Sequence, residues 1–307
     1  MWFARLWGRL PLGLTQHLAG LLYFIVYYLM GYRKAVVYQN LYRAFPEKNP
    51  DEIKQLARRF YRHMAQFALE VSATPSMSLQ DFSTRMRIKN PELLETMSQQ
   101  RSRSVIILTV HQGNWEWMLH GLSAHFGVPI DPVYKPLHSE TANQWIYDIR
   151  SRFGARPLSM DESTRDILRH RKQFRLFAMV ADQSPIREER GIWREFLHRN
   201  AKFYVGGQAL AQVTRFPVVF AQCHKLKNGY YELELHPVAE PPYEKNSDAI
   251  IERYIALAEH AIKAQPETWL WTNRRWKRTE ARDKYMDAWH AARKAREAAA
   301  EEESDKP

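Results

Sequence analysis

The chain contains almost no cysteine. Among its 307 residues Cys223 is the only one, so no disulfide can form within the chain, and a cysteine-based metal site is not expected. Cys223 lies in the segment PVVFAQCHKL, which has the pattern of a β-strand. Because neighbouring side chains of a strand point to opposite faces, Cys223 and His224 would not form a thiolate pair. We therefore expect a buried, unreactive thiol.

Several other sequence features are missing. The chain has no internal repeat and no Gly/Ser-rich linker, so nothing divides it into separate folding units. It also lacks the HExxH, GxSxG and P-loop motifs. Acidic residues are in deficit: 34 Asp and Glu stand against 45 Lys and Arg, for a net charge of +11. That excess favours an anionic partner, which could be a phospholipid surface, a nucleic acid or a phosphorylated substrate.

Charge is absent from one long stretch near the N-terminus. Residues 10–32 carry no charged side chain, and basic residues flank the stretch on both sides. This length is sufficient for a membrane span, and its aromatic flanks are typical of a membrane interface. A helix lying in the interface and a buried core helix are the alternatives. A cleaved signal peptide is not expected, because no small-residue cleavage site follows Met30. We interpret residues 1–35 as an N-terminal membrane anchor.

The remaining pattern alternates strands with helices. A helix is predicted after Asn49, with Pro50 at its first position and Glu52 at its third. Strands are predicted at 104–110, 128–134, 174–181 and 217–226, and the last is followed by an Asn-Gly hairpin turn and a strand at 230–238. Helices are predicted between them, at 114–126, 141–154, 163–172 and 206–216. This order predicts an α/β fold with a central, mostly parallel sheet flanked by helices over residues 36–280. Residues 281–307 are predicted to form an amphipathic helix and a charged tail.

One short stretch carries a chemical pattern. HQGNWE follows the strand at 104–110, and its histidine and glutamate, His111 and Glu116, are five positions apart. On one continuous helix they would point in different directions. If a strand hands over to a helix at Gly113 and Asn114, the imidazole of His111 can turn back and meet Glu116. A carboxylate on one ring nitrogen leaves the other free to accept a proton from a substrate hydroxyl. The alternative is a strand-end histidine with only a structural hydrogen bond.

A family resemblance favours the catalytic interpretation. HQGNWE resembles the H-x4-[D/E] box of glycerolipid-type acyltransferases, and in particular the form found in bacterial lipid A late acyltransferases. Further blocks resemble that family in the same order along most of the chain. They are NLYRAFPE, VYKPL, MVADQ, REFLHRNA with GGQALAQVTRFPVV, and PETWLWTNRRWKR. The chain departs from the family pattern at Leu197 and His198, where Phe and Gly are usual, and at Asn273, where His is usual.

The resemblance implies transfer of a fatty acyl chain from acyl carrier protein, or from acyl-CoA, to a hydroxyl of a membrane lipid. The acceptor it favours is a lipid A precursor. His111 would be the general base and Glu116 would orient it, with oxyanion donors among the backbone N–H groups near Gly113. The resemblance implies no cofactor and no metal. Candidate substrate-binding residues are Gly113, Asn114, Lys135, Asp182 and Gln183.

These assignments have alternatives. Lys135 could be an ordinary surface lysine, and Asp182 could form a structural ion pair with an arginine. The expected partners are acyl carrier protein, the lipid acceptor and an anionic membrane surface, with no nucleic acid, and the expected location is the cytoplasmic face of a bacterial inner membrane. The acceptor could instead be a lysophospholipid, an ornithine-type lipid or another glycolipid. A non-catalytic, basic membrane-associated protein is a further alternative, which leaves HQGNWE unexplained.

Overall fold

The computed structural model describes residues 12–136, 139–185 and 191–277. The strands are β1 (Met86–Ile88), β2 (Val105–Thr109), β3 (Ile130–Tyr134), β4 (Leu158–Ser159), β5 (Leu176–Val180), β6 (Gly191–Phe196), β7 (Arg199–Tyr204), β8 (Val218–Lys227) and β9 (Tyr230–Ala239). The α-helices are α2 (Leu12–Phe24), α3 (Lys34–Ala44), α4 (Pro50–Ala73), α5 (Leu79–Arg85), α6 (Glu92–Met97), α7 (Trp115–Phe126), α8 (Glu140–Ser151), α9 (Met160–Arg169), α10 (Gly206–Thr214) and α11 (Ala249–Ala264). A π-helix, η1 (Ile25–Leu29), and two 3-10 helices, η2 (Thr74–Ser76) and η3 (Pro266–Thr268), complete the helical segments.

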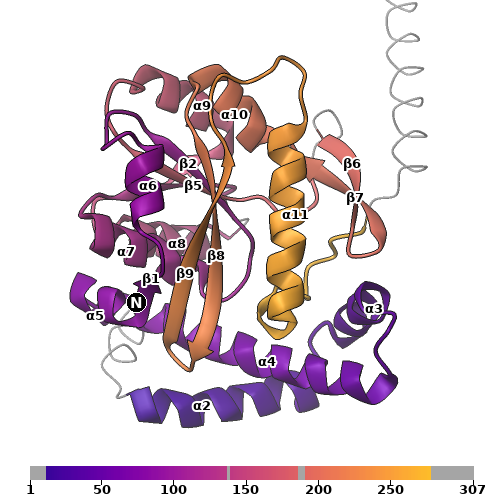
Figure 1. Cartoon of the computed structure of the whole chain (residues 1–307). Helices are drawn as coiled ribbons and strands as arrows, with labels where there is room; N and C mark the ends of the chain where they lie inside the picture. The colour runs from indigo at the N-terminus through magenta and orange to yellow at the C-terminus, as the bar shows by residue number, and fades with distance from the viewer. Residues whose placement is uncertain (1–11, 137–138, 186–190, 278–307) are drawn as a thin grey trace, which may run out of the picture.

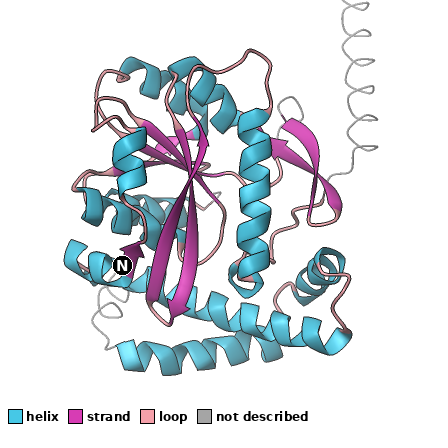
Figure 2. Cartoon of the chain, in the orientation of Figure 1, coloured by secondary structure: helices cyan, strands magenta, loops and turns pink. Residues whose placement is uncertain are grey.

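The main sheet has seven of the described strands, in the order β1-β9-β8-β2-β5-β3-β4 (Figure 1). The strands from β8 to β4 run parallel, β9 runs antiparallel to β8, and β1 runs parallel to β9. Helices lie around this sheet on both sides, and β6 and β7 form a separate hairpin (Figure 2). The predicted α/β fold with a mostly parallel central sheet is confirmed.

The sheet separates two hydrophobic cores. On β2, Ile106 and Leu108 join a core with side chains of α3, α4, α10 and α11. Val105 and Ile107 point the other way and join a core with α5, α6 and α7. The two-residue period of a strand produces this division, and it buries every residue of β2. A strand covered on both faces can therefore present the residues after its carboxyl end from a fixed position.

Most of the locally encoded elements agree with the sequence pattern. The strands predicted at 104–110, 128–134, 174–181 and 217–226 correspond to β2, β3, β5 and β8, and the Asn-Gly hairpin joins β8 to β9 with Gly229 at a φ of +72°. The predicted helix after Asn49 is α4. Its capping box is complete, because Glu52 N–H donates to Asn49 Oδ1 at 3.0 Å and Asn49 N–H donates to Glu52 Oε2 at 2.8 Å.

The β6–β7 hairpin was not expected as a unit. Its two-residue turn consists of Leu197 and His198, both in the left-handed region with φ of +51° and +61°. Such turns favour Asn and Gly, so a Leu-His pair gives no turn signal. Leu197 is fully buried and its N–H donates to Glu259 Oε2 at 3.1 Å, whereas His198 is exposed. This departure from the family pattern therefore lies at a hairpin turn, with one of its residues in the core.

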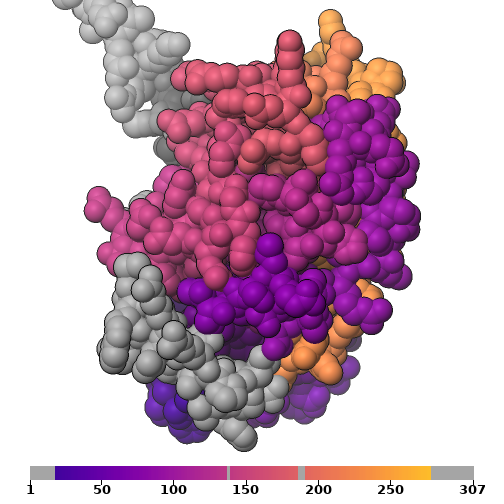
Figure 3. Space-filling view, turned by 90° about the vertical axis from the view of Figure 1, so that its left-hand side faces the viewer, coloured from indigo at the N-terminus to yellow at the C-terminus, as the bar shows by residue number. Residues whose placement is uncertain are grey.

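The N-terminal segment packs as a helical layer at one end of the molecule. Both views place α2 at this end, and in Figure 1 α4 lies between α2 and the sheet (Figure 1, Figure 3). Tyr23 and Tyr27 face inward and are buried. Within the described residues, no helix combines the length and the apolar character that a membrane crossing requires. The anchor predicted at 1–35 thus gains no support as a span, and the helix predicted at 281–307 lies outside the described residues.

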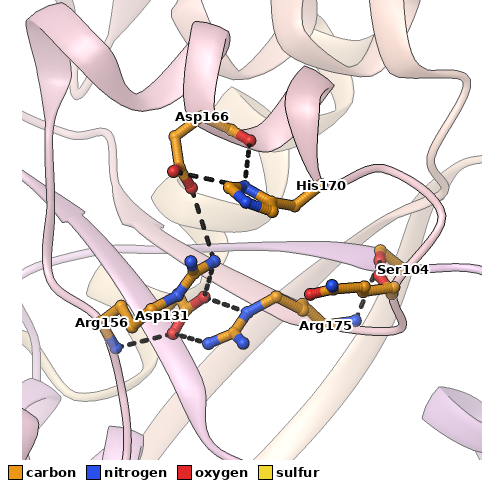
Figure 4. Close-up of polar contacts among 7 residues, drawn as sticks. Ser104, Asp131, Arg156, Asp166, His170 and Arg175 are labelled. Atoms are coloured by element: carbon orange, nitrogen blue, oxygen red, sulfur yellow. Dashed lines mark hydrogen bonds and ion pairs between the residues drawn. The ribbon is translucent and has the colours of Figure 1, made fainter.

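A buried ion-pair network joins the amino ends of the central strands (Figure 4). Asp131, at the start of β3, is fully buried and accepts two hydrogen bonds from the guanidinium of Arg175, just before β5. It also accepts the backbone N–H of Arg156 at 2.8 Å, and Arg156 Nη2 bonds Asp166 of α9 at 3.4 Å. The network lies at the opposite end of these strands from HQGNWE, so its role is to hold β3, β5 and α9 together.

Replacing Asp131 with asparagine should therefore destabilise the fold. Removing one charge of a buried pair leaves the other uncompensated, and we expect a loss of about 3 kcal/mol in the free energy of unfolding. Urea denaturation followed by circular dichroism measures this loss. The matched control is Glu95→Gln, which breaks the more exposed Glu95–Arg101 pair at 2.8 Å and should cost less than about 1 kcal/mol. Equal effects of the two substitutions would contradict a structural role for Asp131.

Candidate active site

The HQGNWE segment forms the predicted turn from a strand to a helix. β2 ends at Thr109, and α7 begins at Trp115 with Asn114 as its N-cap, whose Oδ1 accepts the N–H of Trp117 at 3.0 Å. Gly113 has a φ of +61°, a conformation that favours glycine. His111 thus lies at the carboxyl end of the central strand, where a parallel sheet presents its functional residues.

The ring of His111 is bound by Asp182, not by Glu116. β5 pairs in parallel with β2, so Asp182, two residues after the end of β5, lies beside His111, two residues after the end of β2. Asp182 Oδ1 lies 2.6 Å from His111 Nδ1, and Oδ2 accepts the backbone N–H of His111 at 3.2 Å. Trp269 Nε1 donates to the same Oδ2 at 2.6 Å. Three donors therefore fix the carboxylate, and the carboxylate fixes the ring.

Asp182 is held as an anion. It is buried, and burial alone would raise its pKa, but the charge and hydrogen bond of His111 and the hydrogen bond of Trp269 bring the pKa below its ordinary value. An anionic acceptor at Nδ1 favours the tautomer with a proton there, which leaves Nε2 with a lone pair. Gln183 Nε2 lies 3.3 Å from His111 Nε2. Since the His111 side chain is 18% exposed, Nε2 can accept a proton from a group arriving from outside.

The expected hydrogen bond between Glu116 and His111 is wrong. Both oxygens of Glu116 accept from Arg150 of α8, Oε2 from Nε at 2.9 Å and Oε1 from Nη2 at 2.6 Å. Glu116 is buried in the first turn of α7 and faces α8, and this geometry explains why it misses the ring. Burial alone would raise the pKa of Glu116, but the charge and hydrogen bonds of Arg150, with smaller effects of His120 and His111, lower it. Glu116 therefore acts on His111 through its field alone.

Arg150 is a site residue that the sequence did not indicate. Its Nε and Nη2 bond Glu116, and its guanidinium lies 5.5 Å from the centre of the Tyr134 ring at the end of β3. Nη1 donates to no residue of the described ranges. A guanidinium that still has N–H donors available can bind an anionic oxygen. Its sequence distance of 34 residues from Glu116 gave no local signal for the pair.

Gly113 and Asn114 are engaged within the protein. Gly113 N–H donates to Thr268 O at 3.1 Å, so this backbone N–H is already engaged, and the oxyanion donors expected near Gly113 stay a prediction. Gly113 O lies 3.1 Å from His63 Nε2. Asn114 Nδ2 donates to Glu70 Oε2 at 2.8 Å while its Oδ1 caps α7. Both residues hold the turn in place, and none of these contacts supports a direct contact between them and a substrate.

The other predicted residues lie at the same edge of the sheet. Lys135 is exposed immediately after β3 and has no hydrogen bond or ion pair within the described part of the chain. Gln183 is exposed beside His111, and contact of either residue with a substrate stays a prediction.

Cys223 is buried, and burial raises the pKa of its thiol to about 12, as expected for an unreactive cysteine. In the ranges that the structure describes, no three His, Cys, Asp or Glu residues form a metal-binding group.

Replacing Gly113 with alanine should disrupt the turn. A Cβ at this position would lie 2.6 Å from Cys223 Sγ and 2.8 Å from Cys223 O, and the φ of +61° adds strain for any other residue. We expect a loss of about 3 kcal/mol in the free energy of unfolding from the two effects together. Thermal and urea unfolding measure it. Gly20→Ala is the control, because nothing lies within 4 Å of a Cβ there, and it should leave stability equal or slightly higher.

One comparison with known proteins assigns the chain to a family. The family model for bacterial lipid A biosynthesis acyltransferases matches residues 1–278, which include every element described above. The search of curated protein sequences gave no significant match. Because the model covers most of the chain, and the box His111–Glu116 lies at the carboxyl end of the central strand, the chain belongs to the bacterial lipid A biosynthesis acyltransferase family.

Proposed function

We propose that this chain transfers a fatty acyl group from the thioester of acyl carrier protein to a hydroxyl of a lipid A precursor. The family supports acyl transfer in lipid A biosynthesis in general, and the donor and the acceptor hydroxyl are our proposal. The observation that carries it is the His111–Asp182 pair, with Nδ1 fixed at 2.6 Å and Nε2 turned to a partly open side. Among the described residues, no serine or cysteine is hydrogen-bonded to this pair, so we assign the role of nucleophile to the hydroxyl of the acceptor.

The proposed reaction follows from the two ring nitrogens. Nε2 of His111 takes the proton of the acceptor hydroxyl while the oxygen attacks the thioester carbon, and Asp182 stabilises the imidazolium that forms. The carbonyl oxygen becomes an oxyanion, for which the unused Nη1 of Arg150 is the candidate donor. When the intermediate collapses, the carbon–sulfur bond breaks and the imidazolium returns its proton to the leaving thiolate. The products are the acylated lipid and the free thiol of the carrier.

A membrane surface is the proposed place of action, on the cytoplasmic face of the inner membrane. The outer side of the N-terminal layer exposes large apolar side chains, among them Leu29 at 69% and Met30 at 66% exposed. The basic side chains of Arg33 and Lys34 follow immediately. Apolar side chains beside cations suit a helix that lies in an anionic interface. Such an attachment would bring the site to lipids whose acyl chains stay in the bilayer.

The double substitution Leu29→Glu and Met30→Glu tests this attachment. Two exposed apolar side chains would no longer enter the bilayer, so binding to vesicles containing phosphatidylglycerol should weaken at least tenfold, while the thermal unfolding curve stays unchanged. Vesicle flotation measures the bound fraction. Leu226→Glu is the control, since Leu226 is 53% exposed on β8 and should have no effect. Unchanged binding of the double variant would exclude this surface.

Deletion of the gene in the bacterium that encodes it tests the function. Mass spectrometry of lipid A should show a species that lacks one acyl chain, and the wild-type gene should restore the chain while His111→Gln should not. Loss of an acyl chain from a lysophospholipid product, an ornithine-type lipid or another glycolipid would replace the proposed acceptor. If no lipid of the deletion strain lacks an acyl chain, the chain is not an acyltransferase in the cell. Purified protein with acyl carrier protein or CoA thioesters then identifies the donor.

A further inference from the structure

A buried arginine near the carboxyl end of the described chain has no hydrogen-bond partner among the described residues. Arg275 is 1% exposed, and its Nε, Nη1 and Nη2 are buried and donate to no residue of the described ranges. A guanidinium carries five N–H donors and a full charge, so this arrangement is costly unless other groups stabilise the cation. The proposed reaction does not use Arg275, and the structural ion pairs do not include it.

Aromatic rings supply part of that stabilisation. The guanidinium carbon of Arg275 lies 4.3 Å from the centre of the Phe203 ring and 5.7 Å from that of Phe196. Both rings belong to the β6–β7 hairpin, and their centres lie 5.2 Å apart with nearly perpendicular planes. Ring faces attract a cation and keep water away from it. The hairpin thus holds a positive charge in the interior, and the N–H groups of this guanidinium have no acceptor among the described residues.

The same rings connect Arg275 to the His111–Asp182 pair. The centre of the Phe196 ring lies 6.1 Å from that of the Trp269 ring. Trp269 is the residue whose Nε1 donates to Asp182 Oδ2 at 2.6 Å. Burial lowers the pKa of Arg275 to about 10, and the negative charge of Asp182 opposes that shift. At neutral pH the guanidinium is therefore charged. Asp182 and Arg275 are both buried and both contact one aromatic cluster, in which the low dielectric strengthens the attraction between opposite charges.

We propose that Arg275 is a positioning residue that balances the charge of Asp182 and so keeps His111 in the unprotonated form that a general base requires. With His111 neutral, the charges of Asp182 and Arg275 cancel. Protonating His111 then leaves one excess positive charge in a buried site, which is unfavourable. Without Arg275, the same protonation would neutralise the lone charge of Asp182, and the imidazolium would be favoured. The proposal deepens the proposed function, because it rests on the base role of His111.

Other charged groups also act on His111. Glu116 of α7 acts on it only through its charge, and Glu116 forms its own pair with Arg150 of α8. From α4, His63 lies behind Gly113 and burial lowers the pKa of His63 to about 3, so it is neutral. From α11, Tyr254 donates to Thr109 O at 3.0 Å, and burial raises its pKa well above the ordinary value, so it is neutral too.

Two further groups lie behind the turn. Lys225 of β8 bonds Gln66 of α4 at 2.7 Å, and Gln66 in turn bonds Glu70 at 2.6 Å, so this cation and carboxylate belong to one network. Burial lowers the pKa of Lys225, and the charge of Glu70 opposes this. Arg275 is therefore the cation near Asp182 that has no carboxylate or polar group of its own in the described chain.

The test measures how readily His111 reacts with diethylpyrocarbonate between pH 5 and pH 9, in the full-length protein with its membrane lipids. Of the two protonation states of histidine, the reagent modifies the neutral imidazole, and mass spectrometry of the peptide that contains His111 reports the extent of modification at that ring. Arg275→Met removes the charge and should move the pH midpoint of the reaction upward by about half to one pH unit. Arg275→Lys keeps the charge and should restore the wild-type midpoint. A folded Arg275→Met protein with the wild-type midpoint would overturn the proposal.

Two further variants keep the test decisive. Arg199 lies over the Trp276 ring at 4.5 Å and is partly exposed, so Arg199→Met removes an aromatic-bound cation from the same region and should not shift the midpoint. If Arg275→Met does not fold, Phe203→Leu serves instead. It uncovers the guanidinium to water, which screens the charge, and should shift the midpoint in the same direction by less. An unchanged midpoint in a folded Phe203→Leu protein would then reject the proposal.

The readout is independent of acyl transfer. A shifted midpoint in a protein without transfer activity would retain Arg275 as a charge partner of Asp182 and reject the proposed function. In an active enzyme, the acidic limb of the pH dependence of kcat/KM should move with the chemical midpoint, because both report the neutral form of His111. If the enzyme is active and neither midpoint moves in Arg275→Met, the role of Arg275 is rejected and the proposed function stands.

Discussion

Replacing His111 with glutamine should lower kcat for acyl transfer by about a thousandfold. A general base contributes a factor of about 10² to 10⁴, and no other described side chain holds an acceptor nitrogen in the place of Nε2. Glutamine has a similar reach and can still donate to Asp182, so the turn and the fold should be preserved. Because the base acts in the transition state, KM for the lipid should change little. Initial rates with purified protein, acyl carrier protein thioester and a lipid A precursor measure both constants.

A second histidine of the same helix region provides the control. His125 is exposed near the end of α7, so His125→Gln should keep the wild-type rate. The variants should have equal thermal stability and equal binding to vesicles, which separates chemistry from folding and from membrane attachment. A rate within tenfold of wild type for His111→Gln would remove His111 from the reaction and favour the alternative of a strand-end histidine with only a structural hydrogen bond.

The parts of this site that could be predicted are those encoded within a few residues. The capping box at Asn49 and Glu52 fixes the start of α4, and Asn114 fixes the start of α7. The apolar run before His111 gives β2. Each depends on contacts between near neighbours in the sequence, which the pattern of side chains reports directly. The location of His111 at a strand-to-helix turn was therefore predictable without knowing the rest of the fold.

The partner of His111 depended on the order of the strands. Asp182 was recognised as a carboxylate at a strand end, but only the pairing of β2 with β5 brings it to Nδ1. Glu116 was the nearer carboxylate in the sequence, and its pairing with Arg150 depends on where α8 packs. Trp269 comes from a segment 87 residues beyond Asp182. Contacts between residues so far apart follow from sheet order and helix packing, which no local pattern specifies.

Replacing Asp182 with asparagine should reduce kcat by about a thousandfold while the fold of the site is preserved. Asparagine has the size of aspartate, but its amide can donate to Nδ1, which favours the tautomer with the proton on Nε2. That tautomer cannot accept a proton from the acceptor hydroxyl, and the missing charge no longer stabilises the imidazolium. Losses of about 10⁴ in kcat accompany the same change in histidine–aspartate hydrolases. Steady-state rates across pH 5 to 9 measure the effect.

Glu116→Gln is the comparison that separates the two carboxylates. It keeps the ring of His111 bound to Asp182 and weakens the hold on Arg150, so the expected defect is in stabilisation of the oxyanion, of about ten- to a hundredfold, with the pH dependence of His111 nearly unchanged. It should also lower the stability of the fold, because the guanidinium loses a buried partner. Asp182→Asn should instead abolish the acidic limb of the pH dependence of kcat/KM and remove most of the rate. If Asp182→Asn retained more than a tenth of the wild-type rate while Glu116→Gln lost all of it, Glu116 would be the group that orients His111 during turnover, and the 2.6 Å contact with Asp182 would serve folding alone.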